Sequence, residues 1–398
     1  MPEIIYTGSF RFPDKDAAAQ RVLGIAKSLK FEGFNFIFCG WEQKPRPEDK
    51  IKDLYIFQDF TYFSQSELDL PAETIFQKLV NYFRRGKKTF EWICKYTQEH
   101  SVSHVIIYNA NSLFIYHMFK FCRKYNIKLI CDCTEWYEGS HLPGGKFGLA
   151  NVDNQIRIRF LYPLVHNVIV ISTFLQNYLT RRGCNTIIIP PIIDINDSKW
   201  VTISDSCIPI PDKIIKLIYA GDPGKKDLLN SVFSALNIVN KDFLKIEFTV
   251  LGIDFKTFKA TYFPELRELP TYLKCIGRVA QKDVPRYYQQ CHFSILLREN
   301  NRYAHAGFPT KIVESLASGI PVITNNTSDI SKYIIHKQNG FLLKDSSFQA
   351  VKECFEYILT LTGEDIRVMG QQAKTCSAKY FDVKLFTNPL LNYIYNLE

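Results

Sequence analysis

The segment AGFPTKIVESLASGIPV at 306–322 places a lysine and a glutamate near the start of an expected helix. Pro309 suits the first position of a helix and Gly319 suits its end. The free N–H groups and the positive dipole end of a helix N-terminus hold anions such as a diphosphate, which Lys311 would favour. Glu314, about one turn further in, repels phosphate but is suited to accept hydrogen bonds from sugar hydroxyls. The alternative is an exposed Lys–Glu pair on a helix surface.

A second loop has the residue types of a phosphate site. An apolar strand pattern leads into the loop GDPGKK at 221–226, and a helix pattern follows it. Glycines allow a ligand to approach the backbone closely, and a lysine beside a helix N-terminus can hold a phosphate. Arg298, which follows another expected strand, adds a further cation. A Pro-Gly turn followed by solvated lysines is the alternative for this loop.

Two sets of alternating strand and helix patterns surround these loops. In the first half, β-branched runs alternate with amphipathic helices such as Ala17–Phe31, and the pattern restarts after residue 213. This alternation predicts an α/β fold with two Rossmann-like, doubly wound parallel sheets, whose ligands bind beyond the carboxyl ends of the strands. The expected strands are 4–6, 35–39, 104–108, 128–131 and 167–171, then 214–220, 246–251, 273–276, 293–297 and 321–324.

Composition and charge narrow the function. The chain has 398 residues, enough for two domains, and its net charge of +9 is moderate for this length. Lys and Arg residues are spread along the chain, so a phosphate-bearing ligand is favoured over nucleic acid. Eleven cysteines without a Cys-x-x-Cys pair argue against a zinc site and a disulfide framework, and predict a reducing, cytoplasmic location. Neither a signal peptide nor a membrane span is expected.

Several motifs together resemble those of GT-B glycosyltransferases, specifically the large retaining group called family 4. The segment at 307–322 resembles the family's donor-site signature, and 219–226 is similar to its phosphate loop. LICDCTEWY at 129–137 resembles the Tyr-Asp-x-His-Glu segment of the acceptor-side domain, and 167–172 resembles the strand and serine that close this domain. The resemblance runs through most of the chain and implies two Rossmann-like domains that face each other across a cleft.

The resemblance implies transfer of a sugar, with retention of configuration, from a nucleotide-diphosphate donor to the hydroxyl of a glycan or lipid-linked acceptor. Such an enzyme of EC class 2.4 would act in polysaccharide or glycoconjugate biosynthesis, with the nucleotide sugar as substrate and no cofactor. The Asp-x-Asp sequence at 14–16 lies outside the motifs that carry the resemblance, and no metal is expected. The implied residues are Lys226, Arg298 and Glu135 for catalysis; Gly221, Lys225, Gly307, Phe308, Pro309, Thr310, Lys311 and Glu314 for the donor; and Gly8, Ser9, Arg21, Asp132 and Thr134 for the acceptor.

Three positions depart from the family pattern. The family's first signature glutamate is Ala306 here, the basic residue after the loop glycine is Asp222, and the acceptor-side histidine is Thr134. The first change affects recognition of the transferred sugar, and the third removes any mechanism that relies on this histidine. Two other function classes therefore stay open, namely a nucleotide-sugar epimerase or hydrolase of the same fold and a non-catalytic nucleotide-sugar-binding protein.

The domain boundaries are expected to follow the two sets of strands. The expected parts are an acceptor-binding domain at 1–195, a linker at 196–212, a nucleotide-sugar domain at 213–377 and a C-terminal helix at 378–398 that crosses back to the first domain. Pro389 is expected to break this last segment into two short helices. Basic and aromatic residues alternate at 75–96, a pattern that fits a surface helix lying on an anionic bilayer, here the inner face of the cell membrane. An ordinary domain helix with a solvated basic face fits equally well.

Overall fold

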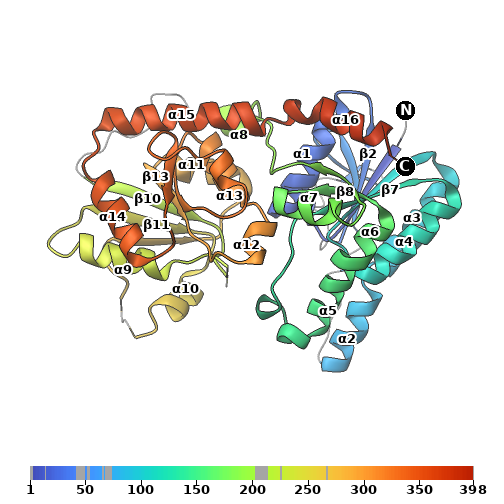
Figure 1. The fold of residues 1–398 in the computed structure, drawn as a ribbon, viewed down its shortest axis with the longest axis horizontal. Coiled ribbons are helices and arrows are strands. Elements are labelled where there is room, and N and C mark those ends of the chain that lie inside the picture. The colour runs from blue at the N-terminus through green and yellow to red at the C-terminus, as the bar shows by residue number, and fades with distance from the viewer. Residues whose placement is uncertain are drawn as a thin grey trace. The chain divides into compact units, whose positions relative to one another are not determined.

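The computed structural model describes residues 3–397 apart from residues 14, 42–49, 52–53, 65–66, 68–73, 202–213, 225 and 266–267. The chain divides into two compact units (Figure 1). Unit 1 comprises Met1–Ile192 and Val383–Glu398, and unit 2 comprises Ile193–Asp382. Among the helices formed by the described residues, none is long and apolar enough to cross a membrane.

Unit 1 is built on a nine-stranded sheet in the order β3-β4-β5-β2-β1-β6-β7-β8-β9. Its central strand β1 is buried after the first residue, as is typical of a parallel sheet with helices on both faces. Strands β3 and β4 run antiparallel to their neighbours at one edge, and β5 pairs with β2 in parallel. The strands are β1 (Glu3–Gly8), β2 (Asn35–Gly40), β3 (Lys50–Ile51), β4 (Leu54–Phe57), β5 (Phe60–Ser64), β6 (Val102–Tyr108), β7 (Lys128–Cys133), β8 (Asn167–Val170) and β9 (Asn185–Ile188).

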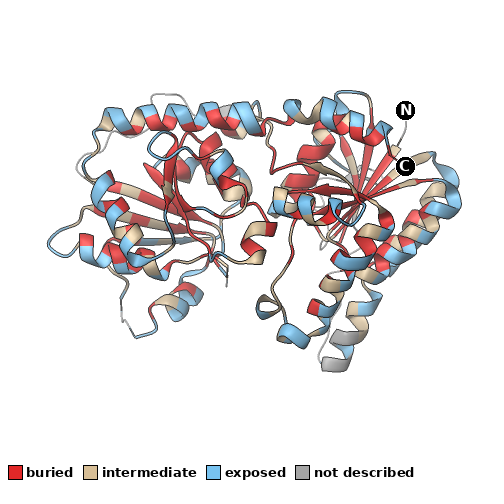
Figure 2. Ribbon diagram, in the orientation of Figure 1, coloured by how far each residue is buried: buried red, intermediate tan, exposed pale blue. Residues whose placement is uncertain are grey.

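Several helices of unit 1 begin at side-chain caps. The carboxylate of Asp16 accepts from the amide of Ala19 at the start of α1, and Asn111 accepts from the amide of Phe114 at the start of α4. The apolar faces of these helices lie against the sheet, while their outer faces are exposed (Figure 2). The helices are α1 (Ala17–Lys30), α2 (Ile75–Arg84), α3 (Lys87–Glu99), α4 (Ser112–Tyr125), α5 (Leu149–Ile156), α6 (Tyr162–Val165), α7 (Thr173–Thr180) and α16 (Thr387–Tyr395), with a π-helical turn at Arg157–Leu161.

Unit 2 is built on a six-stranded, fully parallel sheet in the order β12-β11-β10-β13-β14-β15. Its strands are β10 (Ile215–Ala220), β11 (Ile246–Leu251), β12 (Leu273–Gly277), β13 (Phe293–Leu296), β14 (Val322–Asn325) and β15 (Gly340–Leu343). Its helices are α8 (Ser198–Val201), α9 (Asn230–Val239), α10 (Phe255–Tyr262), α11 (Val284–Tyr288), α12 (Arg302–Ala306), α13 (Thr310–Ala317), α14 (Phe348–Ile358) and α15 (Gly363–Phe381). The strand order changes direction between β10 and β13, the position at which open α/β sheets bind ligands.

The prediction of two doubly wound α/β units is confirmed. All ten expected strands are present, with ends that agree to within two residues. The helix expected between Pro309 and Gly319 is α13, and its apolar stripe is buried as predicted. The sequence pattern missed strands β3, β4 and β5 at one side of the first sheet and the short strands β9 and β15.

The C-terminal segment differs from the expectation in two details. Helix α15 continues to Phe381 and belongs to unit 2, so the chain enters unit 1 at Val383 and not at 378. Pro389 does not separate two helices, because it lies in the first turn of α16, where proline is tolerated. Leu390 and Ile394 of α16 join the core that also contains residues of α1 and β1. The amide of Ile193 donates to the carbonyl of Phe381 (2.8 Å), so the two segments that connect unit 2 to unit 1 lie side by side where they leave unit 2.

Two other segments also need correction. The basic and aromatic stretch at 75–96 is not one helix, because α2 and α3 are separated at Gly86, whose φ of +92° favours glycine. A side chain there would also meet the ring of Phe114, since an added Cβ would lie 2.6 Å from one ring carbon. The expected linker at 196–212 contains α8, and its remainder from residue 202 lies outside the described residues.

Candidate functional site

Helix α13 presents its N-terminus beside the loop that follows β10. Pro309 occupies the N-cap position in an extended conformation, and no side chain among the described residues caps the helix. The first N–H groups of α13 therefore lack the side-chain acceptor that usually satisfies them. The buried side chains Ile312, Val313 and Leu316 fix the helix on the sheet, which leaves Thr310, Lys311 and Glu314 on the other side. This end of α13 has the predicted form of an anion site.

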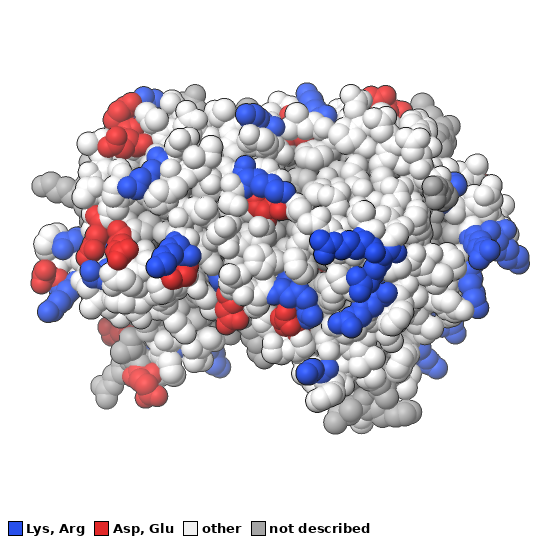
Figure 3. Space-filling view, in the orientation of Figure 1, with Lys and Arg blue, Asp and Glu red and all other residues white. Residues whose placement is uncertain are grey.

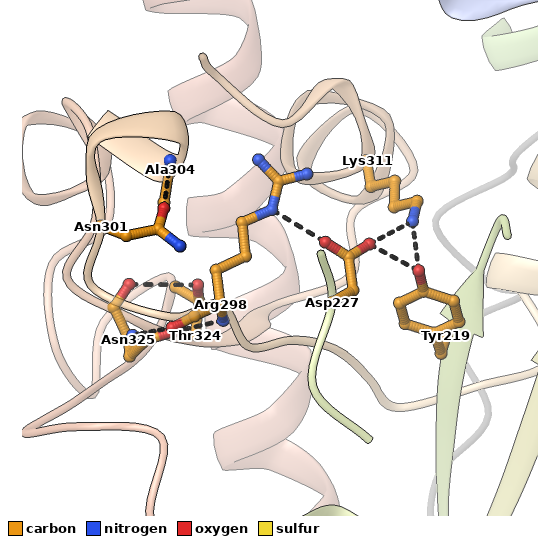
Figure 4. A network of polar contacts seen from close by, with 8 residues as sticks. All are labelled: Tyr219, Asp227, Arg298, Asn301, Ala304, Lys311, Thr324 and Asn325. Carbon is orange, nitrogen blue, oxygen red and sulfur yellow. Dashed lines mark hydrogen bonds and ion pairs between the residues drawn. The ribbon is translucent and has the colours of Figure 1, made fainter. Parts of the chain in front are cut away.

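A buried carboxylate that the sequence analysis did not select, Asp227, organises this region (Figure 4). Its Oδ2 lies 2.7 Å from Nζ of Lys311, and its Oδ1 lies 2.8 Å from Nε of Arg298. The hydroxyl of Tyr219 donates to Oδ2 (2.5 Å), and Nζ of Lys311 also contacts this hydroxyl. The four side chains come from β10, the following loop, the end of β13 and α13. The fold thus collects two cations around one carboxylate.

The backbone of Arg298 is held in place independently of its side chain. Its amide donates to Oδ1 of Asn325 (3.0 Å), and the side-chain amide of Asn325 donates back to the carbonyl of Arg298 (2.8 Å). The amide of Leu228 donates to the carbonyl of Leu297 (2.8 Å), which ties the β10 loop to the end of β13. Because backbone bonds on both sides fix these loops, the geometry of the Asp227 cluster is defined before any ligand binds.

The charges of the cluster do not cancel. Burial raises the pKa of Asp227, but Lys311 and Arg298 lower it more, so that the net pKa lies well below the ordinary value and the group is ionised. Burial lowers the pKa of Lys311, and its neighbours Arg298 and Lys226 add to this effect, while Asp227 opposes it. Two cations face one anion, so the cluster carries an excess positive charge. An anion beside Lys311 would relieve the repulsion between these cations.

The side chain of Lys311 passes so close to residue 221 that only glycine fits there. Its φ is +129°, and an added Cβ would lie 2.4 Å from Cε of Lys311 and 2.9 Å from Nζ. Any side chain at this position would therefore displace the lysine from Asp227. The glycine of the predicted phosphate loop thus makes room for a lysine that arrives from α13, a purpose that the sequence did not reveal.

Glu314 lies one turn along α13 from this cluster. The side-chain amide of Gln281 donates to its Oε1 (2.8 Å). Burial raises the pKa of Glu314, and Lys199, Gln281 and Lys311 oppose this shift. The alternative of an exposed Lys–Glu pair is wrong, because Lys311 pairs with Asp227 and Glu314 is held by Gln281. The predicted role of Glu314 as an acceptor for sugar hydroxyls remains a prediction.

The other predicted donor residues are placed as follows. Lys225 lies outside the described residues, whereas Lys226 is half-buried and near enough to lower the pKa of Lys311. Phe308 is buried and packs on Tyr333, with 5.6 Å between ring centroids, so its ring serves the core of unit 2. The amide of Gly307 donates to the carbonyl of Tyr303 as α12 ends. Of the segment 307–310, the backbone near 308–310 is therefore the part placed to meet a ligand at the start of α13.

In unit 1, two residues predicted to face an acceptor are buried. Arg21 and Asp132 form an ion pair with 2.7 Å between Nη2 and Oδ1, and both side chains are almost fully inaccessible. The hydroxyl of Tyr6 donates to Asp132 (2.6 Å), and Nη1 of Arg21 donates to the carbonyl of Ile189 (2.8 Å). This pair joins α1 to β7 and to the chain after β9. Its role is structural, which corrects the predicted contact with an acceptor.

The remaining predicted residues of unit 1 lie at one edge of the sheet. Gly8 ends β1 with a φ of +129°, and an added Cβ would lie 2.1 Å from the carbonyl oxygen of Tyr108. The amide of Ser9 donates to the same oxygen (3.0 Å). Thr134 follows β7 and is also buried; it accepts from the side chain of Asn109 (2.6 Å) and donates to the hydroxyl of Tyr108 (3.2 Å), and Glu135 comes next in the chain. These residues follow β1 and β7, which lie on either side of β6, so they share the carboxyl edge of the sheet, where ligands bind in such folds, and their roles remain predictions.

Comparison with known proteins finds one family model that matches part of the chain. Residues 206–375 match the model of the family described as "Glycosyl transferases group 1". No curated protein sequence matches the chain. In the described residues, no group of three or more His, Cys, Asp or Glu side chains could hold a metal ion.

Solved structures of glycosyltransferases share the fold over essentially the whole chain. Sucrose-phosphate synthase from Thermosynechococcus elongatus is 14% identical, with a TM-score of 0.71 and full coverage of both chains. HepE from Anabaena, solved in complex with UDP and glucose, is 13% identical, with a TM-score of 0.65 and full coverage of both chains. WaaG, a glycosyltransferase involved in lipopolysaccharide biosynthesis, is 11% identical, with a TM-score of 0.67, and the match covers 99% of this chain and 100% of WaaG.

These matches confirm the predicted GT-B fold, whereas membership of the retaining family 4 stays a prediction. The chain has the fold of GT-B glycosyltransferases, and residues 206–375, which make up most of unit 2, match the group 1 glycosyltransferase model. The Asp227 cluster, α13 and Glu314 all lie inside the matched range.

Proposed function

We propose that the protein transfers a hexose or related sugar from a nucleotide-diphosphate donor to a hydroxyl of a glycan or a lipid-linked saccharide. The observation that carries this proposal is the excess positive charge of Lys311 and Arg298 around Asp227, at the N-terminus of α13 and one turn from Glu314. A site with two fixed cations and free helix N–H groups suits the diphosphate of such a donor. The complex of HepE with UDP and glucose supports a uridine nucleotide as the first donor to test.

In this proposal, the residues of unit 2 act on the leaving group. Negative charge develops on the β-phosphate when the bond to the sugar breaks, and fixed donors that are already in place stabilise it. Lys311, Arg298 and the first amides of α13 are the donors, and Lys226 adds charge at the rim. Glu314 accepts hydrogen bonds from two ribose hydroxyls. No carboxylate nucleophile is needed if the acceptor attacks from the face that the diphosphate leaves, which would give retention.

The proposed acceptor side lies in unit 1. Gly8, Ser9, Thr134 and Glu135 share the carboxyl edge of the unit 1 sheet and form the acceptor side. No cofactor or metal takes part. We propose that the reaction belongs to polysaccharide or glycoconjugate biosynthesis and takes place in the cytoplasm, at the inner face of the membrane.

A panel of nucleotide sugars, headed by UDP-glucose and assayed with and without lipid-linked acceptors, tests this function. Release of nucleoside diphosphate that depends on the acceptor supports transfer, and the anomeric configuration of the product is then read by NMR. Release without an acceptor would point to a hydrolase, and formation of an isomeric nucleotide sugar would point to an epimerase. Binding without turnover over the whole panel would point to a binding protein. Each of these three outcomes would overturn the proposal.

A further inference from the structure

Unit 1 contains an open apolar groove that the proposed reaction does not use. It lies between α2, α4 and α5 and encloses about 410 Å³. Its walls are Phe83, Leu113, Tyr116, Leu149, Val152 and Ile156, each of which is between 39% and 51% exposed. The polar groups in its lining are already bonded, since the amide of Ser112 donates to Asp153 (2.9 Å) and the side-chain amide of Asn111 donates to the carbonyl of Arg85 (2.9 Å). The groove therefore offers hydrocarbon contact and little else.

Further apolar side chains extend this face beyond the groove. Phe147 is 89% exposed just before α5, Phe160 is 67% exposed on the π-helical turn after it, and Leu164 is exposed on α6. A folded domain rarely leaves this many large apolar side chains in water on adjoining elements. Such a surface indicates a partner that provides an apolar environment.

The same elements are strongly cationic. The segments 80–88, 112–125 and 144–164 contain four, three and three Lys or Arg residues, against the single acidic residue Asp153. Of these cations, Arg157 is buried, and Lys87 pairs with Glu91 of the same helix (3.7 Å), so the others make up the cationic surface. Figure 3 shows blue Lys and Arg side chains gathered over the region of α5 and α6, with few red acidic ones among them. Nζ of Lys120 lies 4.6 Å from the ring centroid of Tyr116 in the groove wall. The cations thus border the apolar contact surface directly.

From this combination we infer that the face docks on an anionic lipid bilayer, and that the groove takes hydrocarbon from the lipid interface. An anionic bilayer supplies both negative headgroups for the Lys and Arg residues and hydrocarbon for the exposed rings and aliphatic side chains. A second copy of the chain fits less well, because a two-fold interface through this face would bring like charges together. Each cation near the bilayer surface strengthens binding by about fivefold.

Co-sedimentation with vesicles tests this inference and needs no sugar donor. Full-length protein is mixed with vesicles of phosphatidylglycerol and phosphatidylcholine, or of phosphatidylcholine alone, at low and high salt. We expect binding to the anionic vesicles that weakens at high salt. The double variant Leu113→Glu, Val152→Glu should bind at least about tenfold more weakly, because it places two carboxylates in the groove. The matched control is Ile238→Glu, Phe243→Glu, which changes two exposed apolar residues of unit 2.

Three results would overturn the inference. The first is the absence of wild-type binding to anionic vesicles. The second is a groove variant that keeps its fold by circular dichroism and binds as tightly as the unit 2 control. The third is a dimer in solution that the groove variant abolishes while vesicle binding stays unchanged, which would assign the face to a second copy. Because vesicle binding is measured without substrate, failure of the proposed reaction would leave this test intact.

Discussion

Replacement of Asp227 by Asn tests the charge balance of the unit 2 cluster. The Asn side chain keeps the shape of the carboxylate but carries no charge. Nζ of Lys311 and Nε of Arg298, which lie 2.7 and 2.8 Å from the oxygens of Asp227, would then belong to two buried cations without a counter-charge. Removing one partner of a buried ion pair costs about 3–5 kcal/mol. The side chain of Lys311 is 18% exposed and Asn retains one acceptor oxygen, so the lower end, about 3 kcal/mol, is expected. For a unit of this size, this corresponds to a fall in Tm of about 6–12 °C.

Thermal unfolding followed by calorimetry measures this effect for the transition of unit 2. The matched control is Asp222→Asn, because Asp222 is exposed in the same loop and, among the described residues, accepts a hydrogen bond from the nearby amide of Gly224 alone. If unopposed cations cause the loss, adding Lys311→Met to Asp227→Asn should restore part of the lost Tm. A Tm for Asp227→Asn equal to that of the control, or a double variant that is less stable still, would refute the reasoning.

Four further results are expected. The pKa of Asp227 is lowered in the folded state, so its contribution to stability is present above the unfolded pKa of about 3.9 and is lost as the pH falls below that value. When the free energy of unfolding is measured as a function of pH, Asp227→Asn should lack this acid-dependent loss. Glu314→Gln removes charge-assisted hydrogen bonds worth about 1.5–3 kcal/mol each, so affinity for the nucleoside diphosphate should fall at least about tenfold in calorimetry, and an unchanged affinity would exclude the ribose role. Lys226→Ala should reduce turnover but not Tm relative to the exposed control Lys344→Ala; a lower Tm with full activity would make the lysine structural. Deletion of 389–398 removes buried Leu390 and its neighbours from the core of unit 1 and should lower the Tm of that unit, so an unchanged Tm would show that the segment is dispensable.

The parallel strands could be predicted from the sequence because burial on both faces gives them continuous apolar runs. Strand β10 reads as Ile215–Ala220 with almost every residue buried, and β8 is buried throughout. Strand β9 at the sheet edge is only half-buried along its length, so its pattern is weaker. The edge strands β3 and β4 pair antiparallel in a segment without a clear apolar period. Position within the sheet therefore decided which strands the sequence pattern could identify.

The site was only partly predictable because its side chains meet from distant parts of the chain. Lys311 and Glu314 were selected because they share one helix, and local spacing places them correctly. Asp227 was missed because its partners Arg298 and Lys311 lie 71 and 84 residues further along the chain. In the sequence it follows two lysines, which is typical of a solvated turn. Gly221 in the predicted phosphate loop indicates that another group approaches the backbone closely, but a glycine does not indicate which side chain does so.

A comparison of the two buried carboxylates shows what separates a structural ion pair from a site. In unit 1, Asp132 accepts from Tyr6 of β1 and pairs with one cation, Arg21. In unit 2, Asp227 accepts from Tyr219 of β10, the corresponding central strand, but pairs with two cations. The first cluster is neutral and closed, so an incoming anion would gain nothing from it. The second places two basic side chains around one carboxylate, beside helix N–H groups that no described side chain caps, so it is the one suited to bind a diphosphate.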